Sequence, residues 1–387
     1  MEGTDRKAEG PPADDPRRIR RYWRLGLGLS IAALAASAAY VAAMAAGGCR
    51  ALAARVEPWA GAGLAGRGVV LAIFFAGFAI VGGPFEFAAG WWRERRYGVG
   101  REGPLAWLWR RAKAGAIALA LAVCFFEGIY GLAEWIGGWW WLGAAAVAVA
   151  IEIALGYVFP TGILPLFYRM TRLEDPALEA EFARLAGRAG FDVEGVYRME
   201  LSGQTSKATA FLAGLGRTRR VIVSDTLLED FTPGEIKGVF AHEIGHHAGR
   251  HVAIHLALGA AATTAALGAA ALAVAALSGP LGFRGPADVA NAPVIVGAAG
   301  AVMLAASPLL ALASRATERA ADRYALEATG DSSSFVTLME KLARRNLSLK
   351  NPGRLAKALL FDHPPVAERI EMARRLEDRA RQEDPGP

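Results

Sequence analysis

Two histidines and a glutamate stand at the spacing that zinc hydrolysis requires, in the pentapeptide His242-Glu243-Ile244-Gly245-His246. Residues four apart on a helix lie one turn apart on the same face, so the two imidazoles can bind one tetrahedral Zn²⁺. Glu243 lies about 100° around the helix, where its carboxylate can reach a water on that metal without being a ligand. The pattern predicts a zinc hydrolase in which Glu243 is the general base.

The sequence around this motif predicts the helix that must carry it. Thr232 suits an N-cap, Pro233 suits the first helical position, and Glu235 completes a capping box. Apolar residues recur on one face of the segment, as expected for a helix with a buried side. We therefore expect a helix over 232–250. A polar helix that carries two histidines by chance is the alternative.

Three short runs that we expect to be strands precede this helix, at 193–199, 209–212 and 220–224. An amphipathic helix is expected before them, at 175–189. A small sheet beside a metal helix can hold an extended peptide by adding it as a further strand. We interpret 209–212 as such a substrate-binding edge, with a purely structural hairpin as the alternative.

Two histidines leave a catalytic zinc one protein ligand short, and no third histidine follows at close spacing. The best candidate is Glu318, on an expected helix that continues from the last apolar stretch. Asp322 lies one turn further and can accept the second N–H of a ligating imidazole. A solvated helix face is the alternative explanation for this common spacing.

The chain is 53% hydrophobic over 387 residues, more apolar than an ordinary soluble protein. A bilayer requires about 20 consecutive apolar residues per helix. Six stretches meet that length: 25–48, 68–90, 114–136, 139–159, 252–277 and 289–313. The sequence therefore predicts a mainly α, multispan membrane protein of about six spans with a small α+β element. For any one stretch, a buried core helix is the alternative.

These stretches and motifs divide the chain into six segments. We expect a disordered basic N-terminus (1–24), a four-span membrane region (25–160), substrate strands and the zinc helix (161–251), a two-span hairpin (252–313), distal ligand helices (314–374) and a charged tail (375–387). The first stretch is longer than the apolar core of a signal peptide, so we expect it to be retained.

Basic residues orient the predicted spans. Seven precede the first stretch and seven lie between the second and third, whereas the loops of the opposite side carry four. The positive-inside rule then places both termini and the zinc helix on the cytoplasmic side. The Ala-, Gly- and Arg-rich composition suggests a bacterial inner membrane. The net charge of +6 is explained by these juxtamembrane arginines and indicates no nucleic-acid partner.

Other polar and aromatic residues support weaker expectations. Three histidines recur at four-residue intervals after the motif: His247, His251 and His255. We interpret them as an interfacial polar stripe, with a second metal or proton site as the alternative. Acidic residues in or near the spans are expected to line a water-filled interior: Glu127, Glu134 and Glu152. Trp91-Trp92 and Trp139-Trp140-Trp141 are expected at the membrane interfaces, and Cys49 and Cys124 are not expected to pair.

Several segments, in order, resemble integral-membrane zinc metalloproteases related to the type I CAAX prenyl protease and, more distantly, the heat-shock protease HtpX. They are GLGRTRRVIVSDTLL at 214–228, the H-E-x-x-H motif, an S-R-x-x-E-x-x-A-D pattern at 314–322 and HPP-x-x-ER at 363–369. The resemblance covers about 159–373 and implies one Zn²⁺ per chain. It implies that His242, His246 and Glu318 are the zinc ligands and that Glu243 is the general base. Asp322 would then be the hydrogen-bond partner of a ligating histidine. It also implies that His363 contacts the substrate or stabilises the oxyanion, a helix-cap role being the alternative.

The chain departs from this family at the expected substrate strand. The family's Asn-Ala pair is replaced by Thr209-Ala210, followed by Phe211, and we take these three as candidate substrate-binding residues. A threonine hydroxyl does not offer both the donor and the acceptor of a carboxamide. The resemblance therefore predicts the strand but leaves its usual hydrogen bonding in doubt.

We expect a membrane-embedded zinc metalloendopeptidase that hydrolyses peptide bonds of peptides or membrane proteins, lipidated or not. A quality-control protease of the HtpX kind uses the same chemistry and differs in its substrates. A non-catalytic zinc-binding scaffold does not explain Glu243. A transporter or lipid-binding protein would explain the spans but not the ordered metal motifs.

Overall fold

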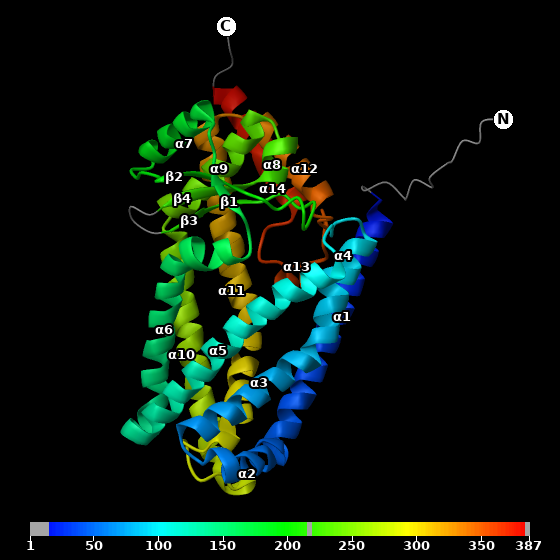
Figure 1. The fold of residues 1–387 in the computed structure, drawn as a ribbon. Coiled ribbons are helices and arrows are strands. Elements are labelled where there is room, and N and C mark those ends of the chain that lie inside the picture. The colour runs from blue at the N-terminus through cyan, green and yellow to red at the C-terminus, as the bar shows by residue number, and fades with distance from the viewer. Residues whose placement is uncertain (1–14, 215–218, 384–387) are drawn as a thin grey trace, which may run out of the picture.

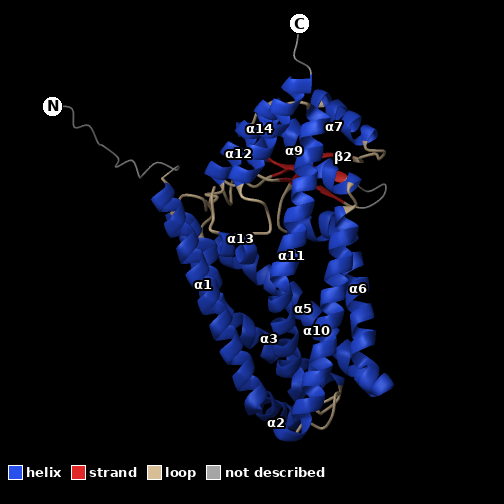
Figure 2. Ribbon diagram, turned by 180° about the vertical axis from the view of Figure 1, so that it is seen from behind, coloured by secondary structure: helices blue, strands red, loops and turns tan. Residues whose placement is uncertain are grey.

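The computed structural model describes residues 15–214 and 219–383. Long helices form a bundle, and a small sheet with short helices covers one end of it (Figure 1). Seen from behind, the strands are confined to that end (Figure 2). We call residues 15–169 and 251–313 the helix bundle, and residues 170–250 and 314–383 the sheet unit.

Six long helices build the bundle: α1 (Pro16–Ala43), α3 (Leu64–Phe87), α5 (Pro104–Ile136), α6 (Trp140–Val158), α10 (His251–Leu281) and α11 (Ala292–Thr329). In the described part of the chain, five continuous helical segments are long and apolar enough to cross a membrane. The longest, Pro104–Leu166, contains both α5 and α6, which a turn at Gly137–Trp139 separates. The six predicted stretches therefore correspond to these six helices, and the chain is a multi-pass membrane protein.

The beginning of the chain is more helical than we predicted. Asp15 caps α1 through its side chain, which accepts a hydrogen bond from the N–H of Arg17, and a proline follows at the first helical position. Ile19 and Tyr22 are buried against Leu347 of the sheet unit. The predicted disorder of 1–24 is therefore wrong for 16–24, because this segment packs on the rest of the protein. Residues 1–14 lie outside the described residues.

The end of the chain is also helical. α14 (Val366–Glu383) buries Ala373 fully and packs Ile370 and Leu376 against the core of the sheet unit. The predicted charged tail at 375–387 is therefore helical to Glu383, because its apolar residues recur at helical spacing. Residues 384–387 lie outside the described residues.

The sheet has four strands in the order β1-β2-β4-β3. Their bounds are β1 (Met170–Arg172), β2 (Gly195–Met199), β3 (Ala210–Ala213) and β4 (Arg220–Ser224). β2 and β4 are parallel, and the two outer pairs are antiparallel. The three predicted strands correspond to β2, β3 and β4, and β3 lies at an edge. β1 was not predicted, since three half-exposed residues give no apolar alternation.

Six shorter helices complete the sheet unit: α7 (Pro176–Arg188), α8 (Asp225–Asp230), α9 (Pro233–Ala248), α12 (Ser332–Arg345), α13 (Arg354–Leu360) and α14. All of them except α13 contribute to one apolar core that includes Phe182, Phe240, Ile244, Phe335 and Leu338. Burying a side chain of this size stabilises the fold by about 1.5–3 kcal/mol. α7 and α9 fall within one or two residues of the helices predicted at 175–189 and 232–250.

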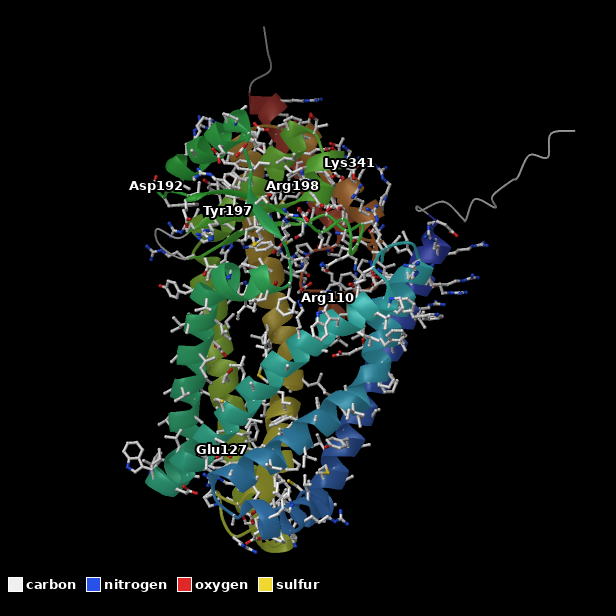
Figure 3. All side chains as sticks on the ribbon, viewed as in Figure 1. Arg110, Glu127, Asp192, Tyr197, Arg198 and Lys341 are labelled. Atoms are coloured by element: carbon white, nitrogen blue, oxygen red, sulfur yellow. The ribbon has the colours of Figure 1, made fainter. Side chains whose placement is uncertain are left out.

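The three acidic residues expected in or near the spans each contact a polar side chain. Arg67 forms ion pairs with Glu127 and Glu134, and Glu152 accepts a hydrogen bond from Thr263. Figure 3 shows Glu127 in the part of the bundle far from the sheet and Arg110 close to it. The water-filled interior stays a prediction. Of the tryptophans expected at the interfaces, Trp140 is 2% exposed and packs against neighbouring helices instead of facing outward, and the interfacial position of the others stays a prediction.

Candidate metal centre

α9 begins with the predicted capping box, in which the side chains of Thr232 and Glu235 each accept a hydrogen bond from the other's N–H. Its apolar face is buried in the core of the sheet unit. At Gly245, α9 approaches α11 so closely that an added Cβ would lie 2.9 Å from Cα of Ala321. This close crossing brings the motif histidines next to Glu318 of α11.

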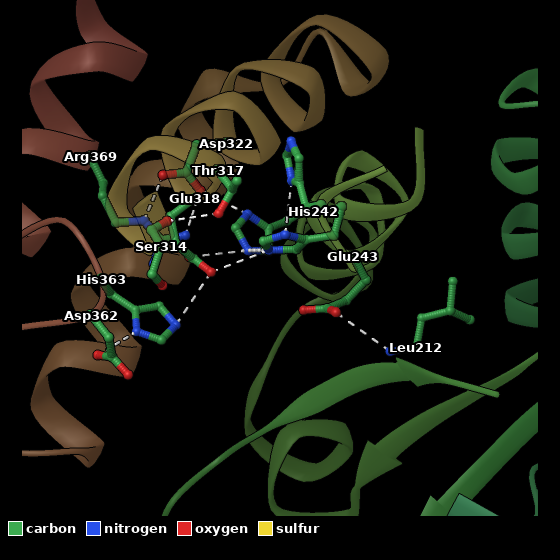
Figure 4. Close-up of polar contacts among 12 residues, drawn as sticks. Leu212, His242, Glu243, Ser314, Thr317, Glu318, Asp322, Asp362, His363 and Arg369 are labelled. Atoms are coloured by element: carbon green, nitrogen blue, oxygen red, sulfur yellow. Dashed lines mark hydrogen bonds and ion pairs between the residues drawn. The ribbon is translucent and has the colours of Figure 1, made fainter. Parts of the chain in front are cut away.

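Three side chains from two distant segments converge at this crossing (Figure 4). The Nε2 atoms of His242 and His246 are 3.1 Å apart. The Glu318 carboxylate lies 3.5 Å from Nε2 of His242 and 3.2 Å from Nε2 of His246. Glu318 therefore lies where the ligand count and the resemblance predicted it, on a helix that continues from the last span.

The donor set and its spacing suit a metal ion. Tetrahedral zinc with ligands at about 2.0–2.2 Å separates neighbouring ligand atoms by about 3.3 Å. The three distances between the ligand atoms of His242, His246 and Glu318, from 3.1 to 3.5 Å, lie around that value. Oε2 of Glu318 is buried and accepts no hydrogen bond from the described residues, which is costly for a carboxylate unless a cation lies beside it. These three residues can therefore hold one metal ion and leave a coordination position free.

Asp322 lies behind His242, as predicted. Its Oδ1 is 2.9 Å from Nδ1 of His242, and it is fully buried. Burial opposes protonation of His242, but contacts with the carboxylates of Asp322 and Glu318 outweigh it and raise the pKa of His242 to about 9.

Arg369 of α14 holds the Asp322 carboxylate by two hydrogen bonds, one of them 2.7 Å from Nε to Oδ2. Arg369 belongs to the HPP-x-x-ER segment, from which we predicted no role for it. That segment was the available signal; the contact itself joins residues 47 positions apart.

Glu243 faces the edge of the sheet. Its carboxylate accepts a hydrogen bond of 3.4 Å from the N–H of Leu212 in β3. Burial raises the pKa of Glu243, although the neighbouring imidazoles oppose the shift. The side chain is therefore close to the metal cluster and more basic than an ordinary glutamate.

β3 turns main-chain groups that do not pair with β4 toward this edge. Thr209 pairs with β4, because its carbonyl accepts from the N–H of Ser224 and its N–H donates to Oγ of Ser224. Main-chain groups alternate between the two sides of a strand, so those of Ala210 and Leu212 face the open edge. These groups can pair with an added peptide strand.

The three predicted substrate-binding residues differ in position. Thr209 and Ala210 line the cavity beside the metal cluster. The side chain of Phe211 lies on the other face of the sheet, packed with Leu164 and Ile222. A strand turns successive side chains to opposite faces, so Phe211 does not reach the cavity. Leu212, through its N–H, is the contact that we did not predict.

His363 approaches the cluster from the opposite side to β3. Its Nε2 lies 3.4 Å from Glu318, and a hydrogen bond with Asp362 raises its pKa. The side chain is 56% exposed, so it is accessible to a substrate. Arg315 of α11 donates hydrogen bonds to the carbonyls of Lys357 and Phe361 and thereby holds this loop in place.

A cavity of about 360 Å³ connects these groups. His242, Glu243, Glu318 and His363 lie on its polar side. Apolar side chains of α8, α9 and α12 form its other wall: Leu227, Val239, Leu338, Met339 and Leu342. The cavity is therefore polar at the cluster and apolar beside it, which is typical of a ligand site. A separate cavity of about 490 Å³, lined by charged residues such as Arg110 and Glu102, contains none of the cluster residues.

The three histidines after the motif do not form one stripe. His247 lies near the ring of Phe191, and its pKa is lowered to about 4 by burial and by Arg219. His251 contacts His246, and His255 contacts Thr317. Among the described residues they make no second metal cluster.

Comparison with known proteins agrees with this geometry. Residues 172–377 match "Peptidase family M48", and residues 19–169 match "CAAX prenyl protease N-terminal, five membrane helices". Within 19–169 the chain has four long helices and the short α2 (Cys49–Ala60). The crystal structure of S. mikatae Ste24p aligns over 95% of this chain and 92% of that one, with a TM-score of 0.82 and 20% identity, which shows the shared fold.

Curated relatives include the uncharacterized metalloprotease YhfN of Bacillus subtilis, 28% identical over 63% of this chain and 58% of its own length. CAAX prenyl protease 1 of Saccharomyces cerevisiae is 34% identical over 24% of this chain and 21% of its own length. The CAAX prenyl protease 1 homologue of Arabidopsis thaliana is 26% identical over 57% of this chain and 52% of its own length. The chain spans about half the length of such relatives, or less.

The fold is that of Ste24p, and the membrane helices match the N-terminal membrane part described for CAAX prenyl proteases. The metal cluster and the sheet unit lie within the peptidase part of the chain. By the match over more than half of its length, the chain belongs to peptidase family M48.

Proposed function

We propose that this chain is a zinc metalloendopeptidase of the gluzincin type, with one Zn²⁺ held by His242, His246 and Glu318. The observation that carries the proposal is the convergence of these three ligands beside Glu243 and an open strand edge. A structural zinc site is normally closed by four protein ligands, whereas three ligands leave room for catalysis. The presence of Glu243 next to the cluster argues against a non-catalytic scaffold.

Zinc in such a site polarises a carbonyl and lowers the pKa of water. Glu243, desolvated and within reach, takes the proton from the attacking water and delivers it to the leaving amine. His363 approaches from the other side of the cluster and donates a hydrogen bond to the developing oxyanion, a contribution of a few kcal/mol in comparable sites. Asp322 fixes the orientation of the His242 ring.

The substrate lies along β3 in this proposal. Main-chain groups of Ala210 and Leu212 pair with the peptide, and the hydroxyl of Thr209 contributes one hydrogen bond from the strand's start. The Leu212 N–H that now contacts Glu243 then binds the peptide, which frees the carboxylate for catalysis. Phe211 supports the strand from the opposite face of the sheet.

The distribution of charge supports a cytoplasmic active site. The basic start of α1 and the arginines of α4 (Arg93–Arg96) lie at the end of the bundle that the sheet unit covers (Figure 1). By the positive-inside rule this end faces the cytoplasm. We accordingly place both termini on that side, and the protein in a bacterial inner membrane. The six segments predicted from the sequence are retained in this arrangement, with the helical ends corrected above.

We propose that the substrates are peptides or membrane proteins that carry a CAAX-like C-terminus. Relatives named CAAX prenyl proteases and the matching N-terminal membrane part support this substrate class. The apolar wall of the cavity suits an aliphatic side chain next to the scissile bond.

The test is cleavage of a prenylated CAAX peptide and its unprenylated twin by the detergent-purified protein, with Glu243→Gln beside the wild type. We expect cleavage of the prenylated peptide by the wild type and none by the variant, which should retain its zinc. Equal cleavage of both peptides would favour a broad quality-control protease of the HtpX kind. Turnover by Glu243→Gln would contradict the assigned base.

A further inference from the structure

The two motif histidines have different neighbours behind them. Nδ1 of His242 faces the carboxylate of Asp322. Nδ1 of His246 faces another imidazole: Nδ1 of His251 lies 3.1 Å away, and the two rings meet edge to face at 81° with centroids 5.1 Å apart. His251 is 6% exposed, so this contact is shielded from solvent.

The joint between α9 and α10 is shaped to make this contact. Arg250, between the two helices, has φ 52° and ψ 31°, a left-handed conformation that non-glycine residues rarely adopt. The preceding Gly249 has an ordinary φ, but a Cβ there would lie 2.2 Å from Nε2 of His251. The turn therefore brings His251 back against α9, and the missing side chain at Gly249 leaves room for its ring.

The chemistry of the contact has one consistent arrangement. Nε2 of His246 faces His242 and Glu318, so a metal ion there takes the Nε2 lone pair and leaves the proton on Nδ1. That Nδ1–H requires an acceptor. A neutral His251 with its own proton on Nε2 presents a lone pair at Nδ1 and supplies that acceptor. Since it contacts the far side of the His246 ring, His251 is no ligand itself.

We propose that His251 is a positioning residue for the metal ligand His246: it accepts the Nδ1–H hydrogen bond and fixes the ring's tautomer and orientation. The inference rests on the proposed zinc site and extends it to the first residue of a membrane helix. Partners behind a metal-ligating histidine affect metal affinity by roughly 10- to 100-fold when removed.

The test is the zinc dissociation constant of the full-length protein in detergent, measured by chelator competition. His251→Phe keeps a ring of similar shape and removes the acceptor, so we expect about 10- to 100-fold weaker zinc binding. His251→Asn places an amide oxygen near the position of Nδ1 and should restore affinity to within about threefold of the wild type, since it restores the acceptor. A purely structural role would not produce this rescue.

Two further variants separate the contact from general damage. Gly249→Ala leaves every polar group in place but pushes His251 away, and should weaken zinc binding in the same direction. His255→Phe is the matched control, because His255 lies one turn further and contacts Thr317 rather than a ligand; its zinc affinity should stay within about threefold of the wild type. Thermal unfolding of the metal-free variants confirms that each is folded.

If the wild type binds zinc and folded His251→Phe binds it equally well, the inference is overturned while the proposed function stands. Equal weakening in His251→Phe and His251→Asn would also overturn it, because the acceptor would then not matter. If the wild type binds no zinc at all, the proposed metal site itself is wrong.

Discussion

The metal cluster is supported differently on its two sides. On the side of α11 and α14, His242 rests on a buried carboxylate, Asp322, which Arg369 holds with two hydrogen bonds. At the α9–α10 joint, His246 rests on His251, an imidazole only five residues away in the chain. The first support is charged and long-range, and the second is neutral and local.

This difference shows which part of the site depends on the whole fold. The Asp322–Arg369 pair exists only when α11 and α14 pack together, and a buried ion pair that loses one partner becomes strongly destabilising. The contact of His251 depends on one turn of backbone and carries no net charge. Damage to the first support should therefore reduce both stability and metal binding, and damage to the second should reduce metal binding with a much smaller loss of stability.

The largest effect is expected from the ligand that both sides share. Glu318→Ala removes the carboxylate that lies within 3.5 Å of both imidazoles, and two histidines alone do not retain a catalytic zinc. We expect loss of zinc and of hydrolysis, with zinc content measured by mass spectrometry of the purified protein. Normal zinc content in Glu318→Ala would contradict the assignment of Glu318 as the third ligand.

Next in size is the loss of Arg369. Arg369→Leu leaves the Asp322 carboxylate buried without its cation, and we expect a loss of about 3–5 kcal/mol in the free energy of unfolding of the sheet unit. Chemical unfolding of the metal-free protein measures it. Because His251→Phe removes no charge, the free energy of unfolding should fall by at most half as much in that variant. Equal losses in the two variants would contradict the distinction between the two supports.

A smaller effect, acting on both histidines at once, is expected at the helix crossing. Gly245→Ala adds a Cβ 2.9 Å from Cα of Ala321, and overpacking of this kind costs about 1–3 kcal/mol. We expect reduced stability together with weaker zinc binding, since α9 must move away from Glu318. The same measurements on Gly187→Ala, an open position in α7, provide the control. Unchanged zinc affinity in a folded Gly245→Ala would show that the close crossing of α9 and α11 does not determine the positions of the metal ligands.

The smallest effect on the metal is expected at β3, which contacts neither support. Thr209→Asn introduces a carboxamide where the family's usual pair has one. We expect an unchanged zinc affinity and a KM lowered by a few-fold, because the amide supplies both a donor and an acceptor to the peptide. Steady-state kinetics with a CAAX peptide measure it. A changed zinc affinity would mean that β3 also shapes the cluster.

Residues with local signatures could be predicted from the sequence, and those defined by tertiary contacts could not. The spacing of His242, Glu243 and His246 and the capping box before them are properties of one helix, and both are present as expected. Glu318 required the ligand count of zinc and the family resemblance, because its partners lie on another helix. Arg369 stood in the HPP-x-x-ER segment without an assigned role, and the N–H of Leu212 gave no signal, since each acts through a contact with a distant segment.

The same distinction applies to the fold. Six apolar stretches predicted the six long helices, but the helical start of α1 and the end of α14 were missed, because their stability comes from packing on other elements. The burial of Trp140 within the bundle likewise follows from neighbouring helices rather than from its own sequence.

The most direct test of the central claim is diffraction from crystals of the full-length protein collected on both sides of the zinc absorption edge. The account predicts one anomalous peak per chain, bounded by Nε2 of His242, Nε2 of His246 and the carboxylate of Glu318. Its absence from zinc-replete crystals, or a peak coordinated by other residues, would contradict the account.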